Sequence, residues 1–236
     1  MSRLVRPSRS AVEFAGAAWP QFMRPLALEL AAHRPIREVL PGVYHWTAIH
    51  PRIKQPVDSY YIQFARVVVD PMVPREGLEW FERRERPTQV VLTNRHHLRH
   101  SARYADAFAY PIRCSEPGLH EFAHGPGVEG FAFEEELAPR ITAHQLGVIC
   151  PDDTALHIRT ADAGALAFAD GLTRPRGGGL RFVPGFLMGD DASTVRAGLR
   201  ESLRRLLELD FEHLLFAHGD PLIGGGKTAL REFVDR

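Results

Sequence analysis

The sequence predicts an α/β (α+β) protein in which two β-sheets pack face to face and helices cover their outer sides. Its 236 residues, 44% of them hydrophobic, are enough for one sizeable domain with a buried core. Short runs of β-branched and aromatic residues alternate with amphipathic segments. Each half of the chain opens with strands and closes with a strand followed by a helix. Packed layers bury the apolar faces of such elements, which favours the two-sheet arrangement.

An N-terminal helical arm is expected over residues 1–40, and the main domain over residues 41–236. Residues 11–33 have a helical pattern that Pro20 and Pro25 interrupt, and the run from Pro35 to Pro41 ends it. The apolar residues of this arm include Trp19, Phe22, Met23, Leu26 and Leu30. These residues either cover the core or form a strip for self-association, and the second alternative predicts a homodimer.

The first half of the main domain is expected to begin with antiparallel strands. Val, Tyr, Trp and Ile dominate short runs that Pro and Asp separate. Strands are expected at 43–48, 59–65, 66–70 and 89–93, and helices at 77–85 and 99–108. The run at 89–93 has three consecutive apolar residues at its centre, which indicates a buried strand.

The second half follows a loop-rich segment that contains Pro117, Gly118, Gly125 and Pro126. Strands are expected at 139–148, 154–160, 164–170 and 213–218, and helices at 193–209 and 228–235. The helix at 193–209 has the clearest pattern, because its apolar residues form one stripe and charged residues occupy the other faces.

Composition excludes several classes of partner. Lys plus Arg equal Asp plus Glu at 29 each, so no single-sign field attracts nucleic acid or an anionic membrane surface. No run approaches the roughly 18 apolar residues of a membrane-spanning helix. The two cysteines, Cys114 and Cys150, are too few for a disulfide framework and suit a reducing compartment such as the cytoplasm. A small molecule or a second copy of the chain is therefore the expected partner.

Four segments at the ends of predicted strands are rich in residues that bind metals or transfer protons. They are Asn94–His100, Cys150–Asp153, Asp170–Gly171 and His218–Pro221. Loops at strand ends commonly carry function, although a single histidine there is more often a surface or structural residue. The order of the four segments along the chain is the more specific signal.

That order resembles the metallo-β-lactamase superfamily over about residues 40–235. In that family a strand ending in Leu-Thr leads into H-x-H-x-D-H, a loop supplies a further His, and later strands end in a bridging Asp and a final His. Here VVLT leads into Asn94-x-His96-x-Leu98-Arg99, LAFAD ends at Asp170, and LLFAHGDP contains His218. The resemblance implies a four-layer αββα sandwich, a hydrolase-like activity, and Cys150 in place of the loop His.

The departures from the family motif are equally informative. The resemblance implies that Asn94, Leu98, Arg99 and Cys150 replace metal ligands, while His96, Asp170 and His218 are retained. A binuclear centre is then lost, because Leu has no lone pair and Arg is always cationic. At most one metal remains, zinc or another transition metal, with two nitrogens, one sulfur and one oxygen as ligands. The predicted ligands are His96, Cys150, Asp170 and His218.

Two functions are compatible with this altered site. In a metal-dependent hydrolase acting on an ester, thioester or similar bond, Asp170 and His96 are the expected catalytic residues. In an inactive protein that binds a small molecule or anion, or serves as a scaffold, no metal is needed. The binding residues are then expected to be Asn94, Arg99 and His218, in a network with His96 and Asp170. Arg99 is expected to pair with Asp170 and to hold a carboxylate or phosphate.

Two further patterns in the sequence lie near these candidate site residues. His97 and His100 are expected to be surface residues, because they point away from the face that His96 uses. The run from Gly219 to Thr228 resembles a nucleotide-binding P-loop, but Pro221 stands where that motif requires glycine. The glycines of this run are expected to form a tight turn before the last helix, with Thr228 as its N-cap.

Overall fold

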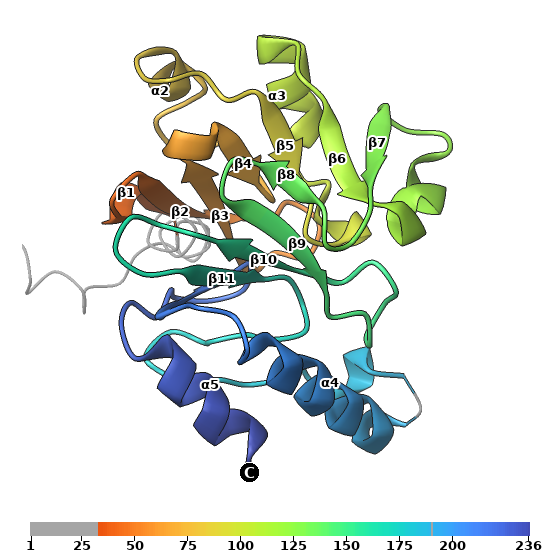
Figure 1. Cartoon of the computed structure of the whole chain (residues 1–236). Helices are drawn as coiled ribbons and strands as arrows, with labels where there is room; N and C mark the ends of the chain where they lie inside the picture. The colour runs from red at the N-terminus through yellow and green to blue at the C-terminus, as the bar shows by residue number, and fades with distance from the viewer. Residues whose placement is uncertain (1–32, 190) are drawn as a thin grey trace, which may run out of the picture.

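The structure, a computed structural model, describes residues 33–189 and 191–236. Two β-sheets pack face to face, and helices lie on the outer side of each, which gives four layers (Figure 1). This arrangement confirms the αββα sandwich expected from the sequence.

The first sheet has seven strands in chain order. They are β1 (Arg34–Leu40), β2 (Val43–Ile49), β3 (Pro56–Ile62), β4 (Val67–Val69), β5 (Gln89–Val91), β6 (Ile112–Ser115) and β7 (Val128–Phe131). The strands from β1 to β4 pair antiparallel, and those from β4 to β7 pair parallel. Strands β4 and β5 therefore end at the same edge of the sheet.

The second sheet has five strands in the order β12-β11-β10-β9-β8. They are β8 (Glu136–Ala138), β9 (Ile141–Gln145), β10 (Thr154–Ile158), β11 (Ala165–Phe168) and β12 (His213–Phe216). Only β11 and β12 pair parallel, in register from Ala165 opposite His213 to Phe168 opposite Phe216. Their carboxyl ends also meet at one edge, which brings the loops that follow them together.

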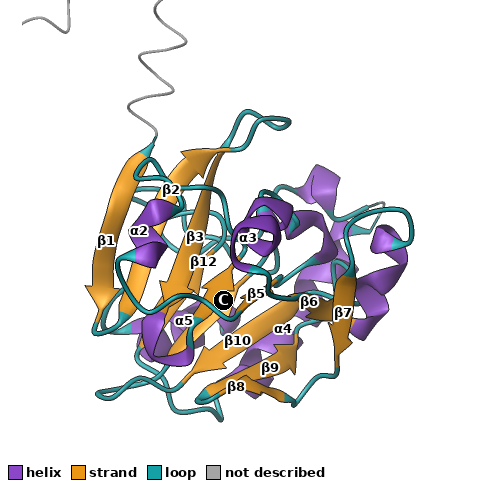
Figure 2. Cartoon of the chain, turned by 90° about the horizontal axis from the view of Figure 1, so that it is seen from above, coloured by secondary structure: helices purple, strands orange, loops and turns teal. Residues whose placement is uncertain are grey.

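Helices cover the outer face of each sheet. The α-helices are α2 (Glu79–Glu82), α3 (Ser101–Phe108), α4 (Ala192–Leu206) and α5 (Gly226–Val234), and the 3-10 helices are η2 (Gln63–Ala65), η3 (Arg95–His97), η4 (Glu116–Phe122) and η5 (Gly185–Leu187). Helices α2 and α3 lie over the first sheet (Figure 2), and α4 and α5 cover the second.

Three hydrophobic clusters correspond to the three interfaces between the four layers. The cluster between the sheets contains Val69, Val91 and Leu156, each at most 2% exposed. A second cluster joins β11 and β12 to α4 and α5, and a third joins the first sheet to α2 and α3. Both faces of the central strands are thus buried, which explains why the run at 154–158 is buried throughout.

Most predicted elements are present, but four strands were missed. Strand β1 contains Pro35, which is tolerated because the strand lies at the edge of its sheet, and its sequence RPIREVL does not alternate polar with apolar residues. Strand β6 has four residues, and β7 and β8, four and three residues long, lie within the segment that was expected to be loop. Such short strands carry too few residues for a clear period-two pattern.

The expected helical arm differs from the structure at its C-terminal end. Residues Arg34–Leu40 form β1, which pairs with β2 and belongs to the first sheet. The remainder of the arm, including its apolar strip, lies outside the described residues. None of the helices in the described ranges combines the length and the apolar character that crossing a membrane requires.

Candidate metal centre

Polar side chains follow four strand ends and meet between the two sheets. Asp70 follows β4, Asn94 follows β5, Asp170 follows β11 and His218 follows β12. The parallel pairing of β4 with β5 and of β11 with β12 brings these four positions to one end of the sandwich.

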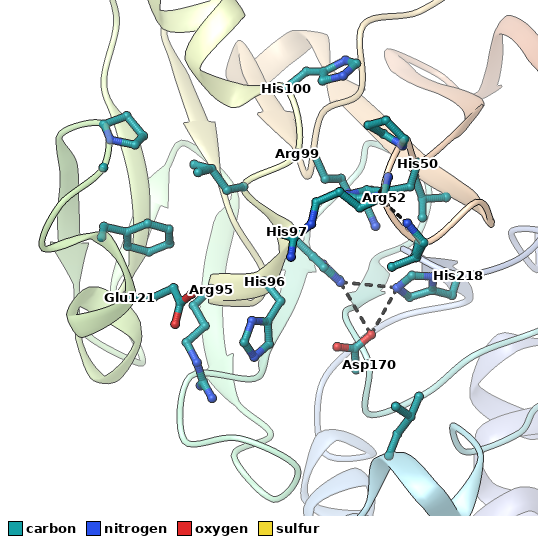
Figure 3. Close-up of a pocket in the computed structure, with 18 residues that line it drawn as sticks. His50, Arg52, Arg95, His96, His97, Arg99, His100, Glu121, Asp170 and His218 are labelled. Atoms are coloured by element: carbon teal, nitrogen blue, oxygen red, sulfur yellow. Dashed lines mark hydrogen bonds and ion pairs between the residues drawn. The ribbon is translucent and has the colours of Figure 1, made fainter.

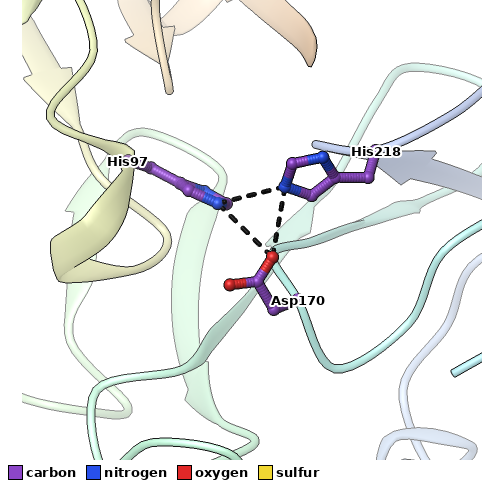
Figure 4. A group of neighbouring side chains, drawn as sticks. All are labelled: His97, Asp170 and His218. Atoms are coloured by element: carbon purple, nitrogen blue, oxygen red, sulfur yellow. Dashed lines mark hydrogen bonds and ion pairs between the residues drawn. The ribbon is translucent and has the colours of Figure 1, made fainter. Parts of the chain in front are cut away.

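Three side chains converge at this end: His97, Asp170 and His218, which we call the triad (Figure 4). His218 Nε2 lies 3.1 Å from Asp170 Oδ1 and 3.3 Å from His97 Nε2, and His97 Nε2 lies 3.5 Å from Asp170 Oδ1. Within residues 33–189 and 191–236, no other group of three His, Cys, Asp or Glu side chains brings its ligand atoms this close.

The triad fits a single transition-metal ion. Nitrogen and oxygen ligands about 2.0–2.1 Å from a tetrahedral zinc lie about 3.3 Å apart, and the triad distances of 3.1–3.5 Å bracket this value. Two imidazoles and one carboxylate on one side of an ion suit zinc or iron(II). The residues present therefore match one metal, with room for further ligands on the cavity side.

Asp70 orients His97 within the triad. His97 Nδ1 lies 2.9 Å from Asp70 Oδ2, which directs Nε2 toward Asp170 and His218. Thr93 fixes Asp70 in turn, since its backbone N–H donates to Oδ1 at 2.8 Å and its hydroxyl donates to Oδ2. Metal-binding histidines commonly have a carboxylate on the second ring nitrogen in this way. Asp70 is only 1% exposed, so this contact is shielded from water.

In the absence of a metal, the pKa values indicate that the proton of the triad resides on His97. Burial opposes charging of His97, but the carboxylates of Asp70 and Asp170 outweigh it and raise its pKa to about 9. Burial lowers the pKa of His218. Burial also acts to raise the pKa of Asp170, yet the charge of His97 and the hydrogen bond from His218 hold it well below its usual range. A metal that binds the triad displaces the proton from His97.

Asn94 joins the end of β5 to the triad. Its Nδ2 donates to Asp170 Oδ2 at 3.2 Å and to Cys150 Sγ at 3.1 Å. Its Oδ1 accepts from the backbone N–H of His96 at 2.8 Å and caps η3. Asn94 thereby holds one oxygen of Asp170, which leaves Oδ1 facing the two histidines.

The structure places the predicted ligands His96 and Cys150 outside the triad. The cap on η3 turns the chain immediately after Asn94, so His97 points inward and His96 is exposed. Successive residues of a 3-10 helix are about 120° apart around the helix axis, so adjacent histidines point in different directions. This explains why His97, and not His96, faces the triad. Cys150 is 5% exposed, and burial raises the pKa of its thiol, so it is a neutral hydrogen-bond partner of Asn94.

Arg99 does not form the expected ion pair with Asp170. Its Nη1 donates to the backbone carbonyls of Asp58 and Asp70 at 2.7 and 2.8 Å, and Nη2 donates to that of Ala217 at 3.3 Å. These three carbonyls lie near the ends of β3, β4 and β12. Arg99 therefore links the ends of the strands that precede Asp70 and His218. Its guanidinium donors are already hydrogen bonded to backbone carbonyls.

His97 is the triad residue that the sequence did not predict as a ligand. The available signal was Asp70, which ends the predicted strand at 66–70 and is suited to orient a histidine. Of the predicted site residues, the structure brings Asp170 and His218 into the triad. Asn94 contacts Asp170, and both His96 and Arg99 line the cavity next to the triad.

A cavity of about 640 Å³ opens beside the triad (Figure 3). It lies between the β2–β3 turn, the segment from Arg95 to His100, the end of η4 with the turn that follows it, and the end of η5. Its volume is that of a small-molecule site.

Comparisons with known proteins support the fold. No protein-family model matches the chain, and no curated protein matches it. A metallo-β-lactamase from Erythrobacter litoralis superposes with a TM-score of 0.61 at 16% identity, over 85% of this chain and 94% of that one. A metallo-β-lactamase from Pontibacter korlensis gives 0.60 at 13% identity, over 86% and 99%.

A flavo-di-iron protein variant from Thermotoga maritima is also similar, with a TM-score of 0.57 at 16% identity over 86% of this chain and 61% of that one. Identities this low establish the fold alone. The chain has the metallo-β-lactamase fold.

Proposed function

We propose that this protein is a hydrolase that uses one divalent transition-metal ion, with zinc as the first candidate, held by His97, Asp170 and His218. The observation that carries this proposal is the geometry of the triad. Its three ligand atoms lie within 3.1–3.5 Å of one another, and a buried carboxylate holds the second nitrogen of His97. The triad also opens onto a cavity of suitable size.

A divalent ion at such a site supplies a Lewis acid for a carbonyl oxygen and lowers the pKa of water. The residues of this chain provide the positioning. Asp70 keeps His97 Nε2 directed at the triad, and Asn94 fixes the distal oxygen of Asp170. The backbone N–H of Gly219 donates to Asp58 Oδ2 at 2.8 Å, which anchors the loop that carries His218. Such preorganisation keeps the ligands in place without rearrangement.

The environment of the triad supports one metal rather than two. The motif position at Leu98 carries an apolar side chain, and the guanidinium of Arg99 donates to three backbone carbonyls. Neither residue can act as a ligand. The proposed reaction is therefore mononuclear, and carboxylic esters and thioesters are the proposed substrates.

The competing proposal is a binding or scaffold protein of the same fold. The observation that favours it is the hydrogen bond of Asn94 to both Cys150 and Asp170, because an amide and a neutral thiol occupy positions where the family resemblance implies metal ligands. In that case the triad is a polar network with no catalytic role.

An activity assay with defined metal content separates the two proposals. Protein stripped with a chelator and reloaded with zinc is tested on chromogenic esters and thioesters, alongside His218→Ala and the control His120→Ala. His120 is exposed, and among the described residues its side chain hydrogen bonds only to the carbonyl of Pro117. We expect hydrolysis to require zinc, to be lost in His218→Ala and to be retained in His120→Ala. Hydrolysis that survives the chelator or His218→Ala refutes the proposal, and a zinc-loaded protein without turnover supports the binding protein.

A further inference from the structure

The described residues that line the cavity beside the triad include more basic than acidic side chains. Among the described residues that line it, the acidic ones are Asp170 and Glu121. Its basic lining residues outside the triad are His50, Arg52, Arg95, His96, Arg99 and His100. Figure 3 shows these side chains together with the triad in the lining of the cavity.

Arg52 is the arginine of this cavity whose guanidinium is available to a ligand. Arg99 donates to backbone carbonyls, and Arg95 pairs with the buried carboxylate of Asp152. Arg52 is exposed on the turn between β2 and β3, and within the described part of the chain nothing forms a hydrogen bond or ion pair with its guanidinium.

The turn that carries Arg52 is held in a defined shape. His50 N–H donates to the carbonyl of Gln55 and Lys54 N–H donates to that of His50, both at 2.9 Å. His50 Nδ1 accepts from the backbone N–H groups of Arg52 and Ile53 at 3.2 and 3.4 Å. Because Nδ1 is an acceptor, the neutral imidazole carries its proton on Nε2 and offers a second donor.

The charge of the site also favours an anion. Burial lowers the pKa of His50, and the positive charges of Arg99 and Arg52 lower it further, which shows that the surroundings of this turn are positive. A divalent ion held by two neutral histidines and the single carboxylate of Asp170 would add a net positive charge.

We propose that this site takes a substrate with an oxyanion group, a carboxylate or a phosphate, which Arg52 binds through its guanidinium while the scissile bond lies at the triad. The proposal rests on the proposed function and specifies its substrate class. A guanidinium presents paired N–H donors that match the two oxygens of such a group. Arg52 is thus a specificity residue outside the set of metal ligands.

A pair of esters that differ in one carboxylate tests this proposal. The substrates are 4-nitrophenyl acetate and mono-4-nitrophenyl succinate, with the zinc-loaded protein, Arg52→Ala and the control Lys54→Ala. Lys54 is an exposed cation on the same turn that does not line the cavity. We expect Arg52→Ala to lower kcat/KM for the succinate ester by about 10- to 100-fold and to change that for the acetate ester by less than about threefold. Arg52→Lys should recover part of the loss.

A binding measurement keeps this test separate from the test of hydrolysis. Succinate and inorganic phosphate are titrated into the zinc-loaded protein and both alanine variants by calorimetry, with zinc content measured in each. We expect Arg52→Ala to weaken binding about tenfold or more with zinc content unchanged, while Lys54→Ala matches the parent. Absence of hydrolysis with this binding pattern refutes only the hydrolase. The anion proposal is overturned if the parent binds neither anion, or if both variants lose binding equally.

Discussion

Replacement of Asp70 by Asn tests how far the triad depends on the carboxylate behind it. Asn has the size of Asp and can still accept from Thr93 N–H, but it removes the negative charge that faces His97 Nδ1 at 2.9 Å. Loss of such a partner commonly costs 10- to 100-fold in metal affinity. We therefore expect a loss of about 1.4–2.8 kcal/mol in the free energy of zinc binding, since each tenfold change is about 1.4 kcal/mol.

The assay is competition for zinc between the protein and a chromophoric chelator at fixed pH. Asp152→Asn is a matched control, because Asp152 is also a buried carboxylate and pairs with Arg95 instead of a triad residue. Both variants are expected to lower the free energy of unfolding, and only Asp70→Asn is expected to weaken zinc binding. Equal zinc affinities for the parent and Asp70→Asn, or equal losses in the two variants, would refute the assigned role of Asp70.

Three further predictions concern stability and the support of the triad. In metal-free protein, His97 has a pKa of about 9 against 6.5 when unfolded, so its stabilising charge is fully present below pH 6.5 and lost as the pH rises through 9. The urea midpoint should fall over this range in the parent and not in His97→Gln, and a parallel fall in both contradicts the assignment. Arg99→Met leaves three backbone carbonyls without their donor and should lower the free energy of unfolding, measured by urea titration, by about 3 kcal/mol. A change below about 1 kcal/mol contradicts the structural role of Arg99. Asn94→Ala removes the cap of η3 and the hydrogen bond to Asp170, so we expect zinc affinity to fall in the same competition assay. Unchanged zinc affinity would show that Asn94 does not position Asp170.

The sequence predicts Asp170 and His218 as neighbours because the buried strands before them leave a visible apolar pattern. Asp170 and His218 each follow a strongly apolar strand, and parallel pairing of β11 and β12 places their ends side by side. Apolar runs bounded by polar loop residues are visible in the sequence because both faces of these strands are buried. The two positions could therefore be identified without coordinates.

The sequence did not show which of the two adjacent histidines, His96 or His97, faces the triad, because the turn at Asn94 decides this. His96 and His97 are adjacent and chemically identical, and the choice between them depends on the hydrogen bond from His96 N–H to Asn94. The sequence predicts Asn94 as a replaced ligand and a binding residue, but its role as a strong N-cap residue decides which histidine faces inward. Arg99 was likewise expected at a ligand position, but its backbone has a positive φ of 44°, and its guanidinium meets carbonyls from three strands that are distant in sequence.

The metal content of the protein tests the central claim most directly. Protein purified without chelators is analysed by elemental mass spectrometry, together with His97→Ala and His96→Ala, which change adjacent histidines of the same helix η3. The structure predicts about one transition-metal ion per chain in the parent and in His96→Ala, and loss of that ion in His97→Ala. Metal that persists in His97→Ala but is lost in His96→Ala, or a parent protein that binds no metal even when zinc is supplied, would contradict the assignment of the triad as a metal centre.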